Sequence, residues 1–176
     1  MDEVHLQDYD SNWPAMYATE AARVRTALPA GLIFGLEHFG STAIPDMAAK
    51  PIIDILVAVR SIEAAREQAV PFMEALGNAF WADNPKRDRL FFVKGLPPAA
   101  LHRTHHVHMT QTDGEMWQRL LFRDYLRSHP NEAARYLALK RGFAVRHSRD
   151  REAYTDAKSV YVEAVMAKAL RFSGEG

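Results

Sequence analysis

The segment of residues 52–59, Ile-Ile-Asp-Ile-Leu-Val-Ala-Val, restricts the possible folds more than any other part of the chain. A nearly continuous run of aliphatic and β-branched residues is typical of a strand that is covered on both faces. Because successive side chains alternate along a strand, Asp54 shares one face with Leu56, and the opposite face is wholly aliphatic. A carboxylate in such a strand is costly to bury unless it is paired or binds a cation. We therefore predict a central strand of a sheet flanked by helices, in which Asp54 either binds a metal or is a structural carboxylate.

The remaining elements follow from turn residues and hydrophobic spacing. Further strands are predicted at residues 32–39, 79–82, 89–94 and 105–110, and helices at residues 13–28, 61–76, 115–127, 131–147 and 151–170. Mixed strands and helices followed by helices alone indicate an α+β (α/β-like) fold. We expect a single domain over residues 1–176, with a strand-containing core to about residue 112 and a helical C-terminal cover over about residues 114–172.

The composition excludes several classes of function. Lys plus Arg and Asp plus Glu are equal at 22 each, so no net field points to nucleic acid as a partner. The chain has no cysteine, which excludes disulfides, thiolate metal sites and cysteine nucleophiles. The N-terminus lacks the basic and apolar blocks of a signal peptide, and no apolar run approaches membrane-spanning length. We expect a cytoplasmic protein that does not enter a membrane.

A glycine-serine turn precedes the central strand. Gly40, Ser41 and Thr42 follow the strand at 32–39, and glycine lets the backbone approach a ligand closely. Free N–H groups at such a turn can bind phosphate oxygens, and Lys50 stands where it could balance phosphate charge. The alternatives are a plain surface turn and a solvated lysine. These residues are the predicted phosphate-binding set.

Histidines are concentrated in the strand predicted at residues 105–110. His106 and His108 share one face of that strand, while Val107 and Met109 share the other. If the apolar pair faces the core, the two imidazoles face a cleft or solvent. Imidazoles at this spacing can bind Zn or Mn, and they can equally be exposed strand residues. We predict His106 and His108 as metal ligands together with Asp54, provided that the two strands are neighbours.

The helical part carries regularly spaced charges. Arg119, Arg123 and Arg127 form a basic stripe, and we interpret this stripe, together with Glu132, Arg135 and Lys140, as solvated helix surface. Tyr154 and Lys158 are secondary candidates for positions that face a ligand. The motifs of serine hydrolases, P-loop kinases and dinucleotide-binding oxidoreductases are absent from the sequence.

Several of these motifs together resemble the GrpB family over nearly the full chain. They are residues 38–45 (His-Phe-Gly-Ser-Thr-Ala-Ile-Pro), 49–55 (Ala-Lys-Pro-Ile-Ile-Asp-Ile), 105–108 and 136–140. Gly40-Ser41 followed by Asp54 on an apolar strand also resembles the opening signature of the nucleotidyltransferase superfamily. The resemblance implies a small mixed sheet flanked by helices, with the Gly-Ser turn at its cleft. In that superfamily the turn holds a triphosphate, and three carboxylates bind two magnesium ions.

The sequence departs from the superfamily signature in its carboxylates. Leu56 stands where the second carboxylate of an Asp-x-Asp pair belongs, and His106 and His108 stand where the later strand would supply the third. Glu37 is a candidate to restore one carboxylate. One aspartate with imidazoles favours a single, softer ion such as Mn or Zn over a pair of Mg ions, or else no tightly bound metal.

These observations give a hypothesis with two rivals. The protein binds a nucleoside triphosphate or another phosphorylated small molecule through Gly40, Ser41, Thr42 and Lys50, with Mg, Mn or Zn on Asp54. If it is an enzyme, Asp54 is the catalytic carboxylate and a nucleotidyl group is transferred in line. The first rival is a non-catalytic accessory or sensory module that kept the pocket. The second is a structural interaction protein with no affinity for nucleotide or metal.

Overall fold

The structure, a computed structural model, describes residues 5–98 and 100–174, so residues 1–4, 99, 175 and 176 lie outside the described residues. Its centre is a five-stranded mixed sheet with the strand order β1-β2-β5-β4-β3. The strands are β1 (Ile33–Phe39), β2 (Ile53–Val59), β3 (Asn78–Phe80), β4 (Arg89–Lys94) and β5 (His105–Thr110). Strands β2 and β5 are parallel, and the other neighbours are antiparallel. The predicted mixed sheet is therefore confirmed.

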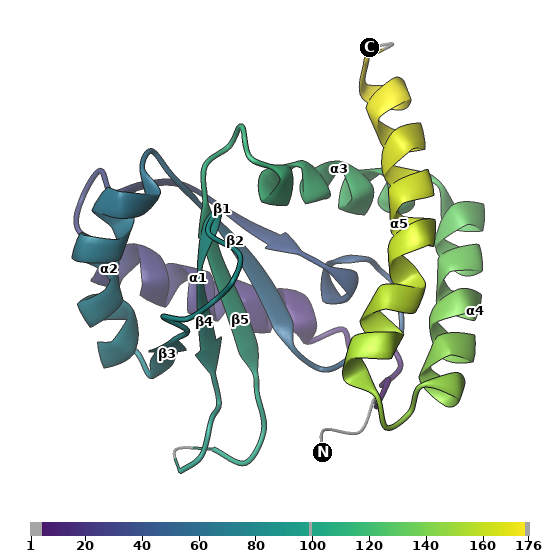
Figure 1. Cartoon of the computed structure of the whole chain (residues 1–176), viewed down its shortest axis with the longest axis horizontal. Coiled ribbons are helices and arrows are strands. Elements are labelled where there is room, and N and C mark those ends of the chain that lie inside the picture. The colour runs from purple at the N-terminus through teal and green to yellow at the C-terminus, as the bar shows by residue number, and fades with distance from the viewer. Residues whose placement is uncertain (1–4, 99, 175–176) are drawn as a thin grey trace.

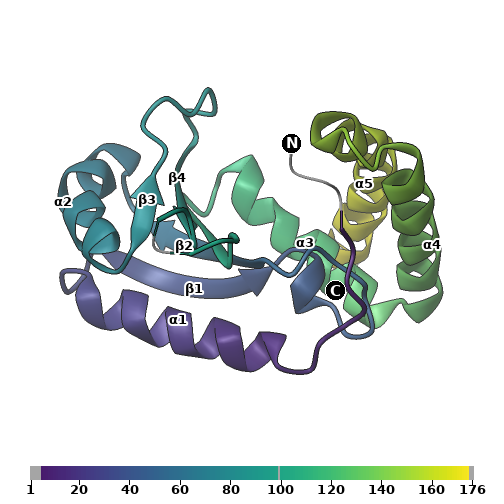
Figure 2. The ribbon, with the colours of Figure 1, turned by 90° about the horizontal axis from the view of Figure 1, so that it is seen from below.

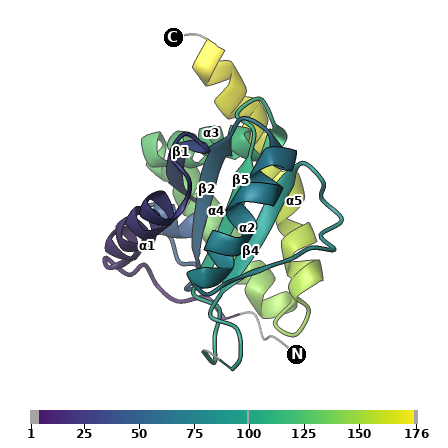
Figure 3. The ribbon, with the colours of Figure 1, turned by 90° about the vertical axis from the view of Figure 1, so that its left-hand side faces the viewer.

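Helices lie on both sides of this sheet. They are α1 (Trp13–Ala27), α2 (Ile62–Ala75), α3 (Glu115–Ser128), α4 (Pro130–Arg146) and α5 (Arg151–Gly174), with a short 3-10 turn, η1 (Ser41–Ala43), after β1. Helices α1 and α2 cover one face, α3 lies on the other, and α4 and α5 pack with α3 beside the end of the sheet (Figures 1, 2 and 3). The α+β class with a helical C-terminal part is confirmed. None of the helices in the described ranges combines the length and apolar character that a membrane span requires.

The aliphatic face of β2 forms the centre of the main core. Ile53, Ile55, Val57 and Val59 are at most 1% exposed, and they pack with buried side chains of α1 and α2. Helix α2 begins at a cap in which Ser61 Oγ accepts a hydrogen bond from the Ala64 N–H at 3.2 Å. The predicted interior position of this strand in the sheet is thus confirmed, since β2 lies between β1 and β5, and the cap fixes where the covering helix begins.

The other face of β2 is divided between an apolar half and a polar half. Leu56 is fully buried and packs with Phe39 and with Met116 from α3. Asp54, two residues earlier on the same face, lies beyond this cover, and 28% of its side chain is exposed. Because α3 covers Leu56 but not Asp54, the accessible part of this face is the end of β2 nearest the Gly-Ser turn.

Replacing Leu56 by aspartate should destabilise the fold rather than restore a metal ligand. The new carboxylate would lie against Phe39 and Met116, the side chains that now pack on Leu56. An uncompensated charge in such a buried position costs about 3–5 kcal/mol. We expect the free energy of unfolding, measured by urea titration, to fall by at least about 3 kcal/mol. The matched Leu56→Met variant conserves volume and should lose less than about 1.5 kcal/mol. Equal stability of Leu56→Asp and wild type would contradict the apolar assignment of this position.

Candidate functional site

Asp54 and the two predicted histidine ligands lie together on neighbouring strands. The parallel register of β2 and β5 places Asp54 opposite His106 and Leu56 opposite His108. Asp54 Oδ1 lies 3.3 Å from His106 Nδ1. One potential ligand atom from each of Asp54, His106 and His108 lies within 4.8 Å of the other two. Two imidazole nitrogens of these histidines, His106 Nε2 and His108 Nδ1, are buried and have no hydrogen-bond partner among the described residues.

The electrostatics of this cluster favour the protonation states that bind metals. Burial raises the pKa of the Asp54 carboxyl, but the hydrogen bond with His106 and the neighbouring imidazoles outweigh it and hold the pKa below its ordinary value. Burial lowers the pKa of His108 to about 3. At neutral pH the cluster therefore contains an ionised carboxylate and a neutral imidazole, which are the forms in which these groups coordinate a cation.

Gly40 is required by the turn itself, and not only for the close approach of a ligand. Its φ of 72° and ψ of −171° lie in a region that is essentially restricted to glycine. A Cβ at this position would lie 2.6 Å from Asp54 Oδ2. The turn therefore needs glycine both for its backbone conformation and because the Asp54 carboxylate packs directly against it.

The turn after Gly40 is anchored by a histidine that the sequence analysis did not single out. His38 Nε2 lies 3.0 Å from Thr42 Oγ1, and the His38 ring stacks on Tyr17 with centroids 4.9 Å apart. Burial lowers the pKa of His38 to about 4, so the ring is neutral at pH 7. Thr42 is 1% exposed and its hydroxyl is hydrogen-bonded within the protein, whereas Ser41 is half-buried and is the more accessible hydroxyl of the turn.

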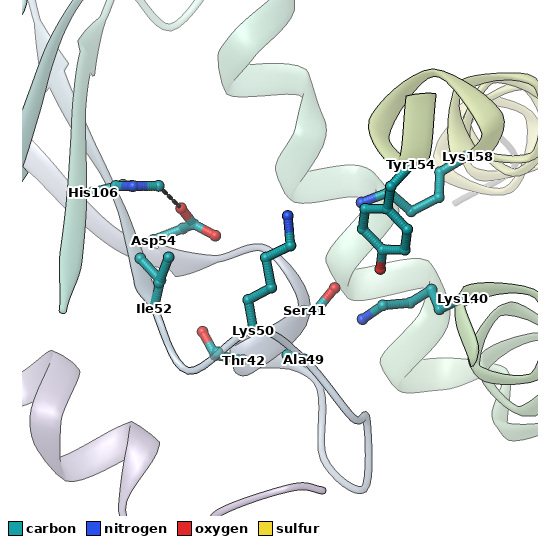
Figure 4. Close-up of a pocket in the computed structure, with 10 residues that line it drawn as sticks. All are labelled: Ser41, Thr42, Ala49, Lys50, Ile52, Asp54, His106, Lys140, Tyr154 and Lys158. Carbon is teal, nitrogen blue, oxygen red and sulfur yellow. Dashed lines mark ion pairs between the residues drawn. The ribbon is translucent and has the colours of Figure 1, made fainter. Parts of the chain in front are cut away.

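A pocket of about 150 Å³ opens beside the Asp54–His106 pair (Figure 4). Most of its lining side chains are acidic, imidazole, hydroxyl or lysine groups. The lining residues are Ser41, Thr42, Ala49, Lys50, Ile52, Asp54, His106, Lys140, Tyr154 and Lys158. Among the predicted site residues, Gly40 packs against Asp54 without lining the pocket, and His108 belongs to the cluster but does not line the pocket. The structure therefore brings the predicted phosphate and metal residues to one place and adds groups from α4 and α5.

Lys140 was predicted to be solvated, and this prediction is wrong. The residue is 2% exposed, and its Nζ donates a hydrogen bond to the Ala48 carbonyl at 2.6 Å. Its Nζ also lies 5.4 Å from the centroid of the Tyr136 ring. Burial first, and then the charge of Lys158, lower the pKa of Lys140 from its ordinary value of 10.5 to about 7. A lysine in this state responds to any negative charge that enters the pocket.

Tyr154 is the centre of the cationic end of the pocket. Its side chain is buried, and the Nζ atoms of Lys50 and Lys158 lie 4.9 Å and 4.2 Å from its ring centroid. Figure 4 shows Lys140, Tyr154 and Lys158 on the side of the C-terminal helices, across from Asp54 and His106. Tyr154 and Lys158 both line the pocket, and the interpretation that they face a ligand stays a prediction.

Two arginines of the stripe on α3, Arg123 and Arg127, contact β1 and the turn after it, while Arg119 is exposed as predicted. Arg123 is 8% exposed, and its Nη1 donates to Glu37 Oε2 at 2.8 Å and to the His38 carbonyl at 2.7 Å. Arg127 Nε donates to the Ala43 carbonyl at 2.9 Å. The solvated assignment is therefore wrong for Arg123. Glu37 is held in this ion pair and does not join Asp54 in the cluster.

The fold and the site together define a mixed α+β protein in which an aspartate-histidine cluster faces a lysine-lined pocket. The chain belongs to the GrpB family, because the model of that family, described as GrpB protein, matches residues 3–168. The resemblance inferred from the motifs is thereby confirmed.

Individual relatives agree with this assignment. A UPF0157 protein of Pseudomonas aeruginosa is 44% identical over 173 residues, which cover 96% of this chain and 69% of the relative. The UPF0157 protein YqkA of Bacillus subtilis is 39% identical over 171 residues, and this chain spans about half of its length (97% of this chain, 48% of YqkA). The crystal structure of the conserved protein GrpB from Enterococcus faecalis superposes with a TM-score of 0.84 at 33% identity, covering 96% of this chain and 99% of that one.

Replacing Gly40 by alanine should destabilise the protein and displace the Asp54 carboxylate. The strained backbone alone costs on the order of 1–3 kcal/mol, and the contact at 2.6 Å adds to it. The matched control is Gly142→Ala in α4, where a Cβ meets nothing within 4 Å and alanine favours the helix. Chemical denaturation should show a loss of stability for Gly40→Ala and no loss for Gly142→Ala. Equal loss in both variants would show that the turn geometry is wrong.

Replacing Lys140 by methionine should change how the free energy of unfolding depends on pH. Between the folded pKa of about 7 and the ordinary value of 10.5, the unfolded chain binds more protons, so the stability of wild type rises with pH. From pH 7 to pH 10 the wild type should gain on the order of 3 kcal/mol relative to Lys140→Met, since one pKa unit is about 1.4 kcal/mol. Urea unfolding at several pH values measures this difference. Parallel pH profiles for the two proteins would refute a depressed lysine pKa.

Proposed function

We propose that this protein binds a nucleotide, or another phosphorylated small molecule, together with one divalent metal ion in the pocket beside Asp54. The observation that carries the proposal is the convergence, on one pocket, of Asp54 and His106 at one end and three lysines at the other. A metal at the first end and phosphate oxygens at the second would neutralise both sets of charges. Few other small-molecule classes require a cation ligand set and a lysine cluster side by side.

The residues of the cluster fit a single metal ion. Asp54, His106 and His108 supply one carboxylate and two imidazoles, a donor set suited to Mn or Zn. His106 faces Asp54 through Nδ1, at 3.3 Å from Oδ1, and the buried His108 Nδ1 has no hydrogen-bond partner among the described residues, so both are candidate nitrogen donors. Mg, which prefers an octahedral shell of oxygens, fits this donor set less well. When bound, the metal would polarise phosphate oxygens and reduce their charge repulsion.

The lysine end of the pocket fits an anion that carries several charges. Lys50, Lys140 and Lys158 outnumber the one carboxylate of Asp54 in the lining. A phosphate beside Lys140 would favour its protonated form and raise its pKa again. Ser41, whose side chain shares a hydrogen bond with Tyr136, adds a hydroxyl from the turn. The ligand class supported best is therefore a di- or triphosphate rather than a neutral or singly charged molecule.

Two versions of this function differ in whether chemistry takes place. In the nucleotidyltransferase version, the lysines hold the phosphates in line with an acceptor, and Asp54 holds the ion; positioning and charge neutralisation account for the rate. In the second version, the protein is a non-catalytic accessory or sensory module. Position 56 favours the second version. Two-metal transfer requires a carboxylate there, and this chain has a leucine that is buried under α3. Incubation with radiolabelled nucleoside triphosphates, followed by product analysis, separates the two versions.

A thermal-shift panel tests the binding itself. Nucleoside triphosphates with Mn, Zn or Mg should raise the apparent melting temperature of wild type, because a ligand that binds the native state stabilises it by mass action. At about 100 times Kd this stabilisation is about 2.7 kcal/mol, a shift of several degrees. The shift should require both metal and nucleotide. It should disappear in Asp54→Asn and weaken strongly in Lys158→Met.

The control for this panel is Asp113→Asn, which removes an exposed aspartate in the turn before α3. It should show the same shift as wild type. If no nucleotide and no metal stabilises the wild type, the proposed function is wrong, and the structural interaction protein becomes the better explanation. A shift that persists unchanged in Asp54→Asn would place the ligand elsewhere.

A further inference from the structure

An exposed tryptophan lies on the open face of the sheet, separated from the aspartate-histidine cluster by one aromatic ring. Trp81 directly follows β3, and 49% of the residue is exposed. The backbone N–H of Trp81 donates to the Phe91 carbonyl at 2.9 Å, which continues the pairing of β3 with β4 by one residue. Its ring centroid lies 5.9 Å from that of Phe91. The ring therefore has an aromatic neighbour, and about half of the residue remains exposed to solvent.

Phe91 connects this tryptophan to the imidazoles. It pairs with His108 in the register of β4 and β5, and its ring centroid lies 5.1 Å from that of His106 and 4.6 Å from that of His108. The next residue, Phe92, faces the main core, where it packs against Phe80. Phe91 and Trp81 thus belong to the same face of the sheet as Asp54, and not to the core face.

The turn after Trp81 holds its backbone in place. Asn84 is 7% exposed although it stands in an exposed loop. Its N–H donates to the Trp81 carbonyl at 3.3 Å, and its Oδ1 accepts from the Lys86 N–H at 3.0 Å. The position of the indole is therefore set by backbone hydrogen bonds and by Phe91, while a large part of the ring stays uncovered. A tryptophan in this situation offers a stacking surface.

The strand order puts this surface across the cluster from the lysines. In strand order from β2 through β5 and β4 to the end of β3, the open face presents Asp54, then His106 and His108, then Phe91 opposite His108, and then Trp81 beside Phe91. The lysines lie on the other side of Asp54, toward α4 and α5 (Figure 4). A ligand that spans this row would meet cations, then the metal ligands, then aromatic rings. That sequence of groups matches a phosphate chain, its bound metal and a flat ring.

We propose that Trp81 and Phe91 form the subsite for the base of a nucleoside triphosphate whose phosphates bind at the lysine end. This inference rests on the proposed function and narrows it, because inorganic polyphosphates and sugar phosphates have no aromatic ring with a π-face to stack. Base-aromatic stacking strengthens binding by about 5- to 100-fold for each base and tolerates any base, since every base has a π-face. The subsite therefore selects nucleotides as a class.

The test compares ATP with inorganic tripolyphosphate, both with Mn, by isothermal titration calorimetry. The two probes share a triphosphate, and tripolyphosphate carries the higher charge, so tighter binding of ATP must come from its nucleoside. We expect wild type to bind ATP more tightly. Trp81→Ala should weaken ATP binding by at least about fivefold and leave tripolyphosphate binding unchanged. Trp81→Phe keeps an aromatic face and should retain most of the affinity for ATP.

The matched control is Phe72→Ala, which removes an aromatic side chain of similar exposure, 44%, from α2 on the other side of the sheet. It should bind both probes as wild type does. If tripolyphosphate binds and ATP binds no more tightly, or if Trp81→Ala weakens both probes equally, the base subsite is wrong while the phosphate site stands. If neither probe binds, the proposed function fails and the subsite fails with it. Circular dichroism of each variant confirms that it is folded.

Discussion

The parallel pairing of β2 with β5 is the constraint on which the candidate site depends. It places Asp54 opposite His106, and a shift of one residue would turn the carboxylate toward the core. The register is fixed from the opposite face, where Ile53, Ile55 and the other alternate residues of β2 are fully packed against α1 and α2. The polar cluster is therefore held in place by apolar burial on the reverse side of the same strands. The glycine at position 40 completes the arrangement by leaving room for the carboxylate.

The pocket exists only because the C-terminal helices dock on the end of the sheet. Arg123 connects α3 to Glu37 and to the backbone of β1, and Lys140 connects α4 to the Ala48 carbonyl. Both are long side chains that lose solvent on docking, so their hydrogen bonds to otherwise buried groups are required for the helices to pack. The same docking delivers Lys158 to the pocket. The cationic end of the pocket is therefore complete only when the C-terminal helices are stably docked.

Local pattern was sufficient to predict the strands, but not their order in the sheet or the helical half of the site. The strand at residues 105–110 has the bounds that alternation predicted, and the placement of Asp54 beside His106 follows once the two strands pair. By contrast, Lys140 and Glu132 stand at positions that look solvated on an isolated helix. In the fold Lys140 is buried, and Glu132 accepts from Tyr161 and Lys168. Helical periodicity identifies which residues share a face, but the partners of a buried charge come from distant segments and leave no local signal.

The central claim is that phosphate and metal share one pocket built from β2, β5, α4 and α5. The most direct measurement is an anomalous difference map from crystals soaked with Mn and a non-hydrolysable nucleoside triphosphate. The account predicts a Mn peak within coordinating distance of Asp54 and His106, and phosphate density within hydrogen-bonding distance of Lys140 or Lys158. A peak and a triphosphate at another surface, or an empty pocket at saturating concentrations of both, would contradict it.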